Sequence, residues 1–177
     1  MADTFEGKLY LPNSHHCFVC GESNAAGLQT RFYIEEGLVK TRLQPQDHHC
    51  GYKDIVHGGV VAAVLDECMG WAASRALGRM CVTAELTIRY LKNVPADRPL
   101  TVATDVQKSN RLLAITHGRI EDDEGTLYAR ADAKFTPLSP EATIEVDDQL
   151  LYRGGEARLF DGLRASLAEK ATEPGRG

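Results

Sequence analysis

The sequence predicts an α+β fold in which a curled antiparallel sheet wraps around one long buried helix. The central segment, residues 57–78, is apolar around nearly its whole circumference, which is typical of a helix buried on every face. Four strand-like segments joined by tight turns follow it, and consecutive strands with short links pair antiparallel. Because such a sheet must cover the apolar helix, we expect it to curl around that helix.

The remaining elements can be placed in chain order. Turn-forming residues such as Pro12 and Gly21 make residues 1–28 irregular. Residues 29–34 and 38–43 then form a predicted hairpin around a short Glu-Glu-Gly turn. The four later strands are expected at residues 80–91, 100–108, 112–120 and 127–136.

The last part of the chain has a different character. Prolines at positions 137 and 140 end the final strand, and residues 157–170 have the apolar spacing of a short amphipathic helix. We therefore expect an irregular N-terminal segment (1–28), one folded domain (29–140) and a C-terminal extension (141–177) that holds this short helix and a frayed tail.

Composition excludes several classes of protein. The 177 residues are 43% hydrophobic and 25% charged, which is typical of a globular chain. Its formal net charge of −5 disfavours a nucleic-acid binder, so we expect no nucleic-acid partner. The longest apolar run, Val60–Leu65, is far shorter than the roughly 20 residues that cross a bilayer, so no membrane insertion is expected.

The cysteine count and the N-terminal residues point to one compartment. The first residues have neither a basic start nor an apolar segment, unlike a secretory signal. Five cysteines is an odd number, which favours reduced thiols over a disulfide framework. We therefore expect a cytoplasmic protein.

Two glycines open the central helix, directly after His57. Gly58 and Gly59 leave backbone N–H groups unshielded at the positive end of the helix dipole. That place suits a carbonyl oxygen that gains negative charge during a reaction. The alternative is that the glycines only allow tight packing against a strand.

An acidic pair lies midway along the same helix. Asp66 stands among apolar residues, where a carboxylate is costly unless it is hydrogen-bonded or serves a functional site. Glu67 points about 100° further around the helix, so the two side chains cannot share one site. We expect one to serve chemistry and the other to find a backbone or arginine partner.

These motifs resemble one known family. His57-Gly58-Gly59 with an acid at the ninth position after the histidine resembles the PaaI-like branch of the hotdog-fold acyl-CoA thioesterases. The wider string GYKDIVHGGVVAAVLDECMGWAA and the upstream CFVCGESNAAGL are similar to segments of that family, as is the strand that begins at Thr83. The resemblance covers roughly residues 17–137 and implies a hotdog fold; the C-terminal helix lies outside it.

The resemblance also implies a site. Asp66 would be the general base or nucleophile, the Gly59 N–H, with that of Gly58 close by, would polarise the thioester carbonyl, and Thr83 would hold the attacking water. Several relatives carry Asn or Gln before the His-Gly-Gly motif, where this chain has His49 in the segment His48-His49-Cys50, so His49 is the candidate donor at that place.

Three further side chains are candidates for substrate binding. His57 would lie at the substrate site; we interpret it as a cap of the helix, and the alternative is a general acid as in related dehydratases. Arg89 and Lys92 flank the loop after the central strand and could meet the phosphates of coenzyme A. The alternative for these two residues is a solvated strand edge.

A metal site is the main rival interpretation of the cysteines. Cys17-x-x-Cys20 has the spacing of metal ligands. The second half of a zinc site would have to come from a looser set of residues, so we expect no metal and no cofactor. That set is His15, His16, His48, His49 and Cys50.

The sequence thus predicts a thioester hydrolase acting on acyl-CoA. A non-catalytic acyl-CoA sensor and a hotdog hydratase or dehydratase that uses His57 are the alternatives. Gly59 and Asp66 are separated by about 10 Å along the helix axis, too far for one chain to build the site alone. We therefore expect a homo-oligomer, a dimer or a tetramer, with composite sites, whose acyl pocket is shaped by residues such as Met69, Trp71 and Leu86.

Overall fold

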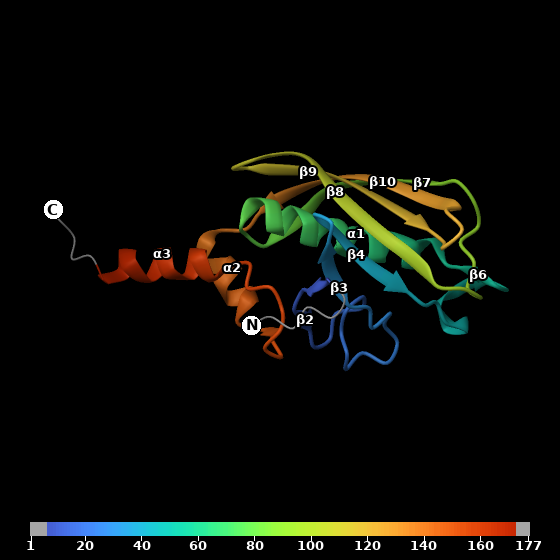
Figure 1. The fold of residues 1–177 in the computed structure, drawn as a ribbon, viewed down its shortest axis with the longest axis horizontal. Helices are drawn as coiled ribbons and strands as arrows, with labels where there is room; N and C mark the ends of the chain where they lie inside the picture. Colours follow the sequence, from blue (N-terminus) through green and yellow to red (C-terminus); the bar gives the residue numbers. More distant parts are fainter. Residues whose placement is uncertain (1–6, 173–177) are drawn as a thin grey trace.

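The computed structural model describes residues 7–172, and it confirms the predicted architecture: a curved antiparallel sheet lies over one long helix, α1 (Gly58–Leu77) (Figure 1). The sheet has seven strands in the order β1-β3-β4-β8-β9-β10-β7, and all neighbouring strands run antiparallel. The bounds of its strands, in chain order, are β1 Leu9–Tyr10, β3 Phe32–Glu35, β4 Leu38–Leu43, β7 Cys81–Tyr90, β8 Leu100–Asn110, β9 Leu113–Glu121 and β10 Leu127–Pro137.

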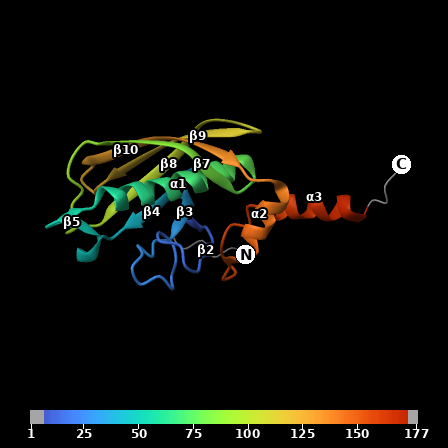
Figure 2. The same ribbon diagram turned by 180° about the vertical axis from the view of Figure 1, so that it is seen from behind.

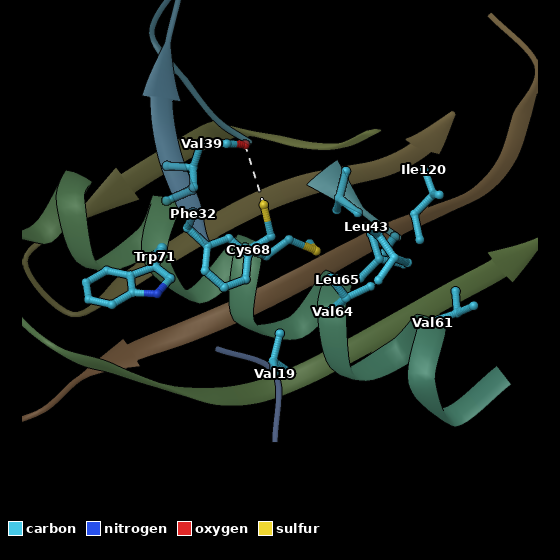
Figure 3. Packing of buried hydrophobic residues seen from close by; sticks show 14 of the residues in the cluster. Val19, Phe32, Val39, Leu43, Val61, Val64, Leu65, Cys68, Trp71 and Ile120 are labelled. Carbon is cyan, nitrogen blue, oxygen red and sulfur yellow. Dashed lines mark hydrogen bonds between the residues drawn. The ribbon is translucent and has the colours of Figure 1, made fainter. Parts of the chain in front are cut away.

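The core forms where the sheet meets α1 (Figure 3). Val61, Val64 and Leu65 of the helix are completely buried. The Cys68 thiol donates a hydrogen bond to the Val39 carbonyl oxygen of β4, at 3.5 Å. Strand β9 approaches the helix closely at Gly118, where an added Cβ would lie 2.8 Å from Met69 Sδ. Glycine at this position lets the helix seat against the sheet.

One face of α1 is covered less completely than the sequence predicts. Residues at helical spacing along it, Gly59, Ala62, Asp66 and Gly70, are exposed or half-buried, whereas the opposite face is fully covered by the sheet. The expectation of burial on every face is therefore wrong for the isolated chain.

Strand β7 is an edge of the sheet. It pairs with β10 on one side, and most of its ten residues are exposed, including Val82 and Tyr90. An edge strand of this length leaves a row of backbone donors and acceptors that another chain can pair with.

The ends of the chain add short elements around this body. In the N-terminal segment, β1 joins the main sheet and β2 (Asn13–Ser14) pairs with β11 (Leu150–Leu151). Before α1, a 3₁₀ turn (Asp47–His49) leads into a small hairpin of β5 (Cys50–Tyr52) and β6 (Ile55–Val56).

Two helices follow the sheet. The sequence analysis missed α2 (Pro140–Asp147), whose start is capped by the Ser139 side chain accepting from the Ala142 N–H. The predicted C-terminal helix is present as α3 (Asp161–Thr172), a few residues later than expected, and it projects away from the sheet (Figure 2). Between residues 7 and 172, no helix is both long and apolar enough to span a membrane.

Candidate active site

Asp66 and Thr83 meet between α1 and β7. The Thr83 hydroxyl donates a hydrogen bond to Asp66 Oδ1 at 2.7 Å. Asp66 is half-buried and not enclosed, because it lies on the partly covered face of α1. Its carboxylate is therefore within reach of a molecule that enters from that side.

The pair lines a cavity of about 380 Å³. Its walls combine these two side chains and a few further polar ones, Glu67 among them, with large apolar side chains, an arrangement typical of small-molecule sites. Trp71 is among the lining residues, as the sequence analysis expects, whereas Met69 is fully buried in the core and Leu86 lies outside the lining. The apolar part of the wall consists of Trp71, Met80, Val82, Phe135 and Leu150.

The start of α1 forms a second cavity, of about 430 Å³, lined by His57, Gly58, Tyr90 and Lys92 among others. His57 is the N-cap of the helix: its Nδ1 accepts a hydrogen bond of 2.9 Å from the Gly59 N–H. The Gly59 donor, which the resemblance assigns to a thioester carbonyl, is thus engaged by a neighbouring side chain. Tyr90, which the sequence analysis did not single out, donates from its hydroxyl to the Gly58 carbonyl at 2.8 Å.

The two cavities have no lining residue in common. The structure therefore brings Asp66 together with Thr83, and His57 together with Gly58 and Lys92, but it does not unite the two groups in one chain. This separation agrees with the length of helix between Gly59 and Asp66.

Two other candidates line neither cavity. Arg89 lines a separate depression with His117 and Arg130, because alternate residues of β7 face opposite sides of the sheet. His49 is 4% exposed, and its Nδ1 accepts from the Gln46 N–H at 3.0 Å. Neither position gives support to the substrate-binding role that the sequence analysis assigned.

Glu67 has a different partner from the one expected. A hydrogen bond of 2.8 Å joins its Oε2 to Cys17 Sγ, where the sequence analysis predicted a backbone or arginine partner. Burial and the nearby Cys17 charge raise the pKa of Glu67 to about 8. The pKa of Cys17 is lowered to about 5, chiefly by a hydrogen bond from Cys20. No sequence pattern signalled this contact, since fifty positions separate the two residues.

The histidines do not complete a metal site with the two cysteines. Within residues 7–172, one group of three potential ligands has its ligand atoms close together, and it consists of Cys17, Cys20 and Glu67. None of the histidines in the predicted set belongs to it. All five cysteines are free thiols in the structure.

Comparison with known proteins identifies the domain. A family model described as the thioesterase superfamily matches residues 53–129, which include the start of α1, Asp66 and Thr83. Residues 53–129 are therefore similar to the thioesterase superfamily. The family that the motifs resemble is confirmed at this level.

Curated relatives of this chain are enzymes by name. Acyl-coenzyme A thioesterase THEM4 of Mus musculus is 35% identical over 98 residues, and the Rattus norvegicus protein of the same name is 33% identical over 98 residues. Each alignment covers 55% of this chain and 42% of the relative. The chain thus matches less than half the length of these curated relatives.

Solved structures of other proteins share the fold. A thioesterase superfamily protein has a TM-score of 0.63 at 27% identity, covering 69% of this chain and 60% of that protein. The PaaI protein of E. coli has a TM-score of 0.60 at 18% identity, and the match covers 67% of this chain and 86% of that protein. At this identity the likeness shows the fold alone. The BH2602 protein of Bacillus halodurans, solved with CoA, has a TM-score of 0.52 at 28% identity. This match covers 56% of this chain and 66% of that protein. The predicted hotdog fold is confirmed.

Proposed function

We propose that this protein is an acyl-CoA thioesterase that hydrolyses an acyl-CoA to a free acid and CoA. Relatives at about a third identity bear the name acyl-coenzyme A thioesterase, and a relative of similar fold was solved with CoA. The observation that carries the proposal is the Thr83–Asp66 hydrogen bond at the mouth of an apolar cavity. In the proposed site this carboxylate lies beside the cavity that would receive the acyl group.

In the proposed reaction Asp66 acts as the base. Thr83 donates to one carboxylate oxygen, which leaves the other free to take a proton from water. The resulting hydroxide adds to the thioester carbonyl carbon, the C–S bond of the tetrahedral intermediate breaks, and the CoA thiolate leaves and takes up a proton. Direct attack by Asp66, through an anhydride that water then cleaves, needs the same geometry.

The carbonyl oxygen is proposed to bind at the start of α1. Backbone N–H groups there lie at the positive end of a 20-residue helix and can stabilise the developing oxyanion. Because His57 Nδ1 accepts from the Gly59 N–H, the carbonyl must share or displace that hydrogen bond. A histidine held as a cap is poorly placed to act as the base of a hydratase, so the cap argues against that alternative.

The two halves of this site are proposed to come from two chains. Antiparallel packing of α1 against α1 of a second copy would cover the face formed by Gly59, Ala62, Asp66 and Gly70. It would also bring Gly58 and Gly59 of one chain to Asp66 of the other, and β7 could pair with its copy along the exposed edge. A dimer is the smallest assembly that completes the site, and it forms two such sites.

Coenzyme A would then run from the composite site across the second cavity. Lys92, which lines that cavity with Gly58, is the proposed contact for a CoA phosphate. The acyl group would enter the apolar cavity beside Asp66, where Trp71 and Phe135 bound its length. Assay of free CoA release across aryl, short and long acyl-CoA substrates tests the activity; tight binding without turnover on any of them would identify a sensor instead.

Mixed dimers test the composite site. One inactive parent is Asp66→Asn, and the other is Gly59→Val, whose side chain would push into His57 and block the carbonyl position, since even a Cβ lies 3.0 Å from His57 Nδ1. In a mixed dimer one site keeps the intact glycine and the intact aspartate. Random re-association makes about half the dimers mixed, so activity should return to roughly a quarter of wild type. If folded parents exchange subunits and no activity returns, the site lies within one chain.

A further inference from the structure

The turn around Cys17 and Cys20 is built so that both sulfur atoms accept backbone hydrogen bonds. The Val19 N–H donates to Cys17 Sγ at 3.3 Å, and the Ser14 N–H donates to Cys20 Sγ at 3.4 Å. The Gly21 N–H closes the turn on the Cys17 carbonyl at 3.0 Å, and any side chain at Gly21 would clash with that carbonyl. Backbone N–H donors stabilise the thiolate form, which is the form that binds metals.

The third member of this group comes from the central helix. Glu67 projects from α1 toward the turn, and its carboxylate oxygen and the two sulfur atoms all lie within 4.8 Å of one another. In a tetrahedral zinc site, ligand atoms at usual bond lengths are separated by about 3.6–3.8 Å. The contact between Cys17 Sγ and Glu67 Oε2, now 2.8 Å, would have to open by about 1 Å, which a glutamate side chain can supply by rotation.

The charges of this group favour a cation. The two thiols and the Glu67 carboxyl group lie close together in a partly buried site. In the described part of the chain no lysine, arginine or histidine forms an ion pair with Glu67. Thiol and carboxyl groups must give up their protons to bind a metal ion. A divalent ion would replace those protons and neutralise most of the charge.

We propose that Cys17, Cys20 and Glu67 are the ligands of a divalent transition-metal site. Two thiolates and one carboxylate within tetrahedral reach suit Zn²⁺, and they do not suit Mg²⁺ or Ca²⁺, which take oxygen ligands. The three ligands also line the cavity beside Asp66, so the fourth coordination position faces that cavity. The ion ties the N-terminal turn to α1 and thereby fixes one wall of the acyl pocket.

Direct metal binding tests the site independently of catalysis. The protein is purified with a thiol reductant, stripped with a chelator and titrated with Zn²⁺ and, separately, with Co²⁺. We expect about one ion per chain and, with Co²⁺, a sulfur-to-metal charge-transfer absorption with the ligand-field bands of a tetrahedral site. The Co²⁺ spectrum of wild type needs no variant, so it stays decisive if substitutions impair folding.

Variants assign the ligands. Cys17→Ser and Cys20→Ser should abolish the charge-transfer band or shift it, and Glu67→Gln should keep the band but weaken zinc affinity by more than about 10-fold. Cys81→Ser is the matched control, since that thiol lines the same cavity outside the ligand group, and it should bind zinc like wild type. A reduced wild type with no thiolate–Co²⁺ absorption, or zinc affinity unchanged in the Cys17→Ser, Cys20→Ser double variant, would overturn the proposal.

Discussion

The hydroxyl of Thr83 lies 2.7 Å from Asp66 Oδ1, and this hydrogen bond joins the exposed edge strand β7 to the middle of α1. Both residues lie where the chain's own packing is least complete, on the partly covered face of the helix and on an unpaired strand edge. The polar pair is therefore accessible to substrate and to a second copy of the chain.

Replacing Asp66 by asparagine should lower kcat by about 10²–10⁴-fold while acyl-CoA binding changes little. The amide keeps the size of the side chain and can still accept from Thr83, but it cannot take a proton or attack the thioester. Release of free CoA measures the rate, and calorimetric titration measures binding. Glu67→Gln is the adjacent control and should cost far less; a larger loss in Glu67→Gln would assign the catalytic role to Glu67.

Replacing Thr83 by alanine should reduce kcat by about 10-fold. It removes the hydrogen bond, worth about 1–2 kcal/mol, by which Thr83 orients the Asp66 base, and about 1.4 kcal/mol corresponds to a factor of ten in rate. Thr83→Ser retains the hydroxyl and should recover most of the activity. Equal kinetics for wild type and Thr83→Ala would remove this residue from the site.

Replacing Gly118 by alanine should destabilise the fold by about 1–3 kcal/mol, because the new methyl group would meet Met69 and Leu65 at 2.8–3.0 Å. Chemical denaturation measures the change in the free energy of unfolding. Gly162→Ala in α3 is the control: nothing lies within 4 Å of its Cβ position, and alanine favours helix. A Gly118→Ala protein as stable as wild type would show that the helix and the sheet can separate there without cost.

The proposed zinc site should bind more tightly as pH rises. Near pH 7 Glu67, with its pKa raised to about 8, and Cys20, with its pKa also raised, both hold protons, whereas the lowered pKa of Cys17, about 5, leaves it a thiolate. Binding then releases about two protons, so affinity should fall by about 100-fold per pH unit between pH 7 and pH 6. Competition with a chromophoric chelator measures this slope. An affinity that does not depend on pH would mean that these groups are not the ligands.

The pattern of hydrophobic residues was enough to predict most of the main sheet and the central helix, because strand and helix periods are local properties of the chain. The six predicted strands of the body and the helix at residues 57–78 are all present. Local pattern does not predict helix α2, because its eight residues are too few for a clear hydrophobic period and begin at a proline, which indicates the end of the preceding strand. The short pairings of β1 and β2 depend on distant partners, which local pattern does not show.

For the site, the sequence by itself determined which residue types stand at the start and the middle of α1, and helix geometry then required that Gly59 and Asp66 lie apart. The tertiary structure alone decided what each of them touches: Thr83 on Asp66, His57 on the Gly59 N–H, and Cys17 on Glu67. These contacts join different elements or depend on a side-chain rotamer. They arise only when the sheet and the N-terminal turn close around the helix, so spacing along the chain does not specify them.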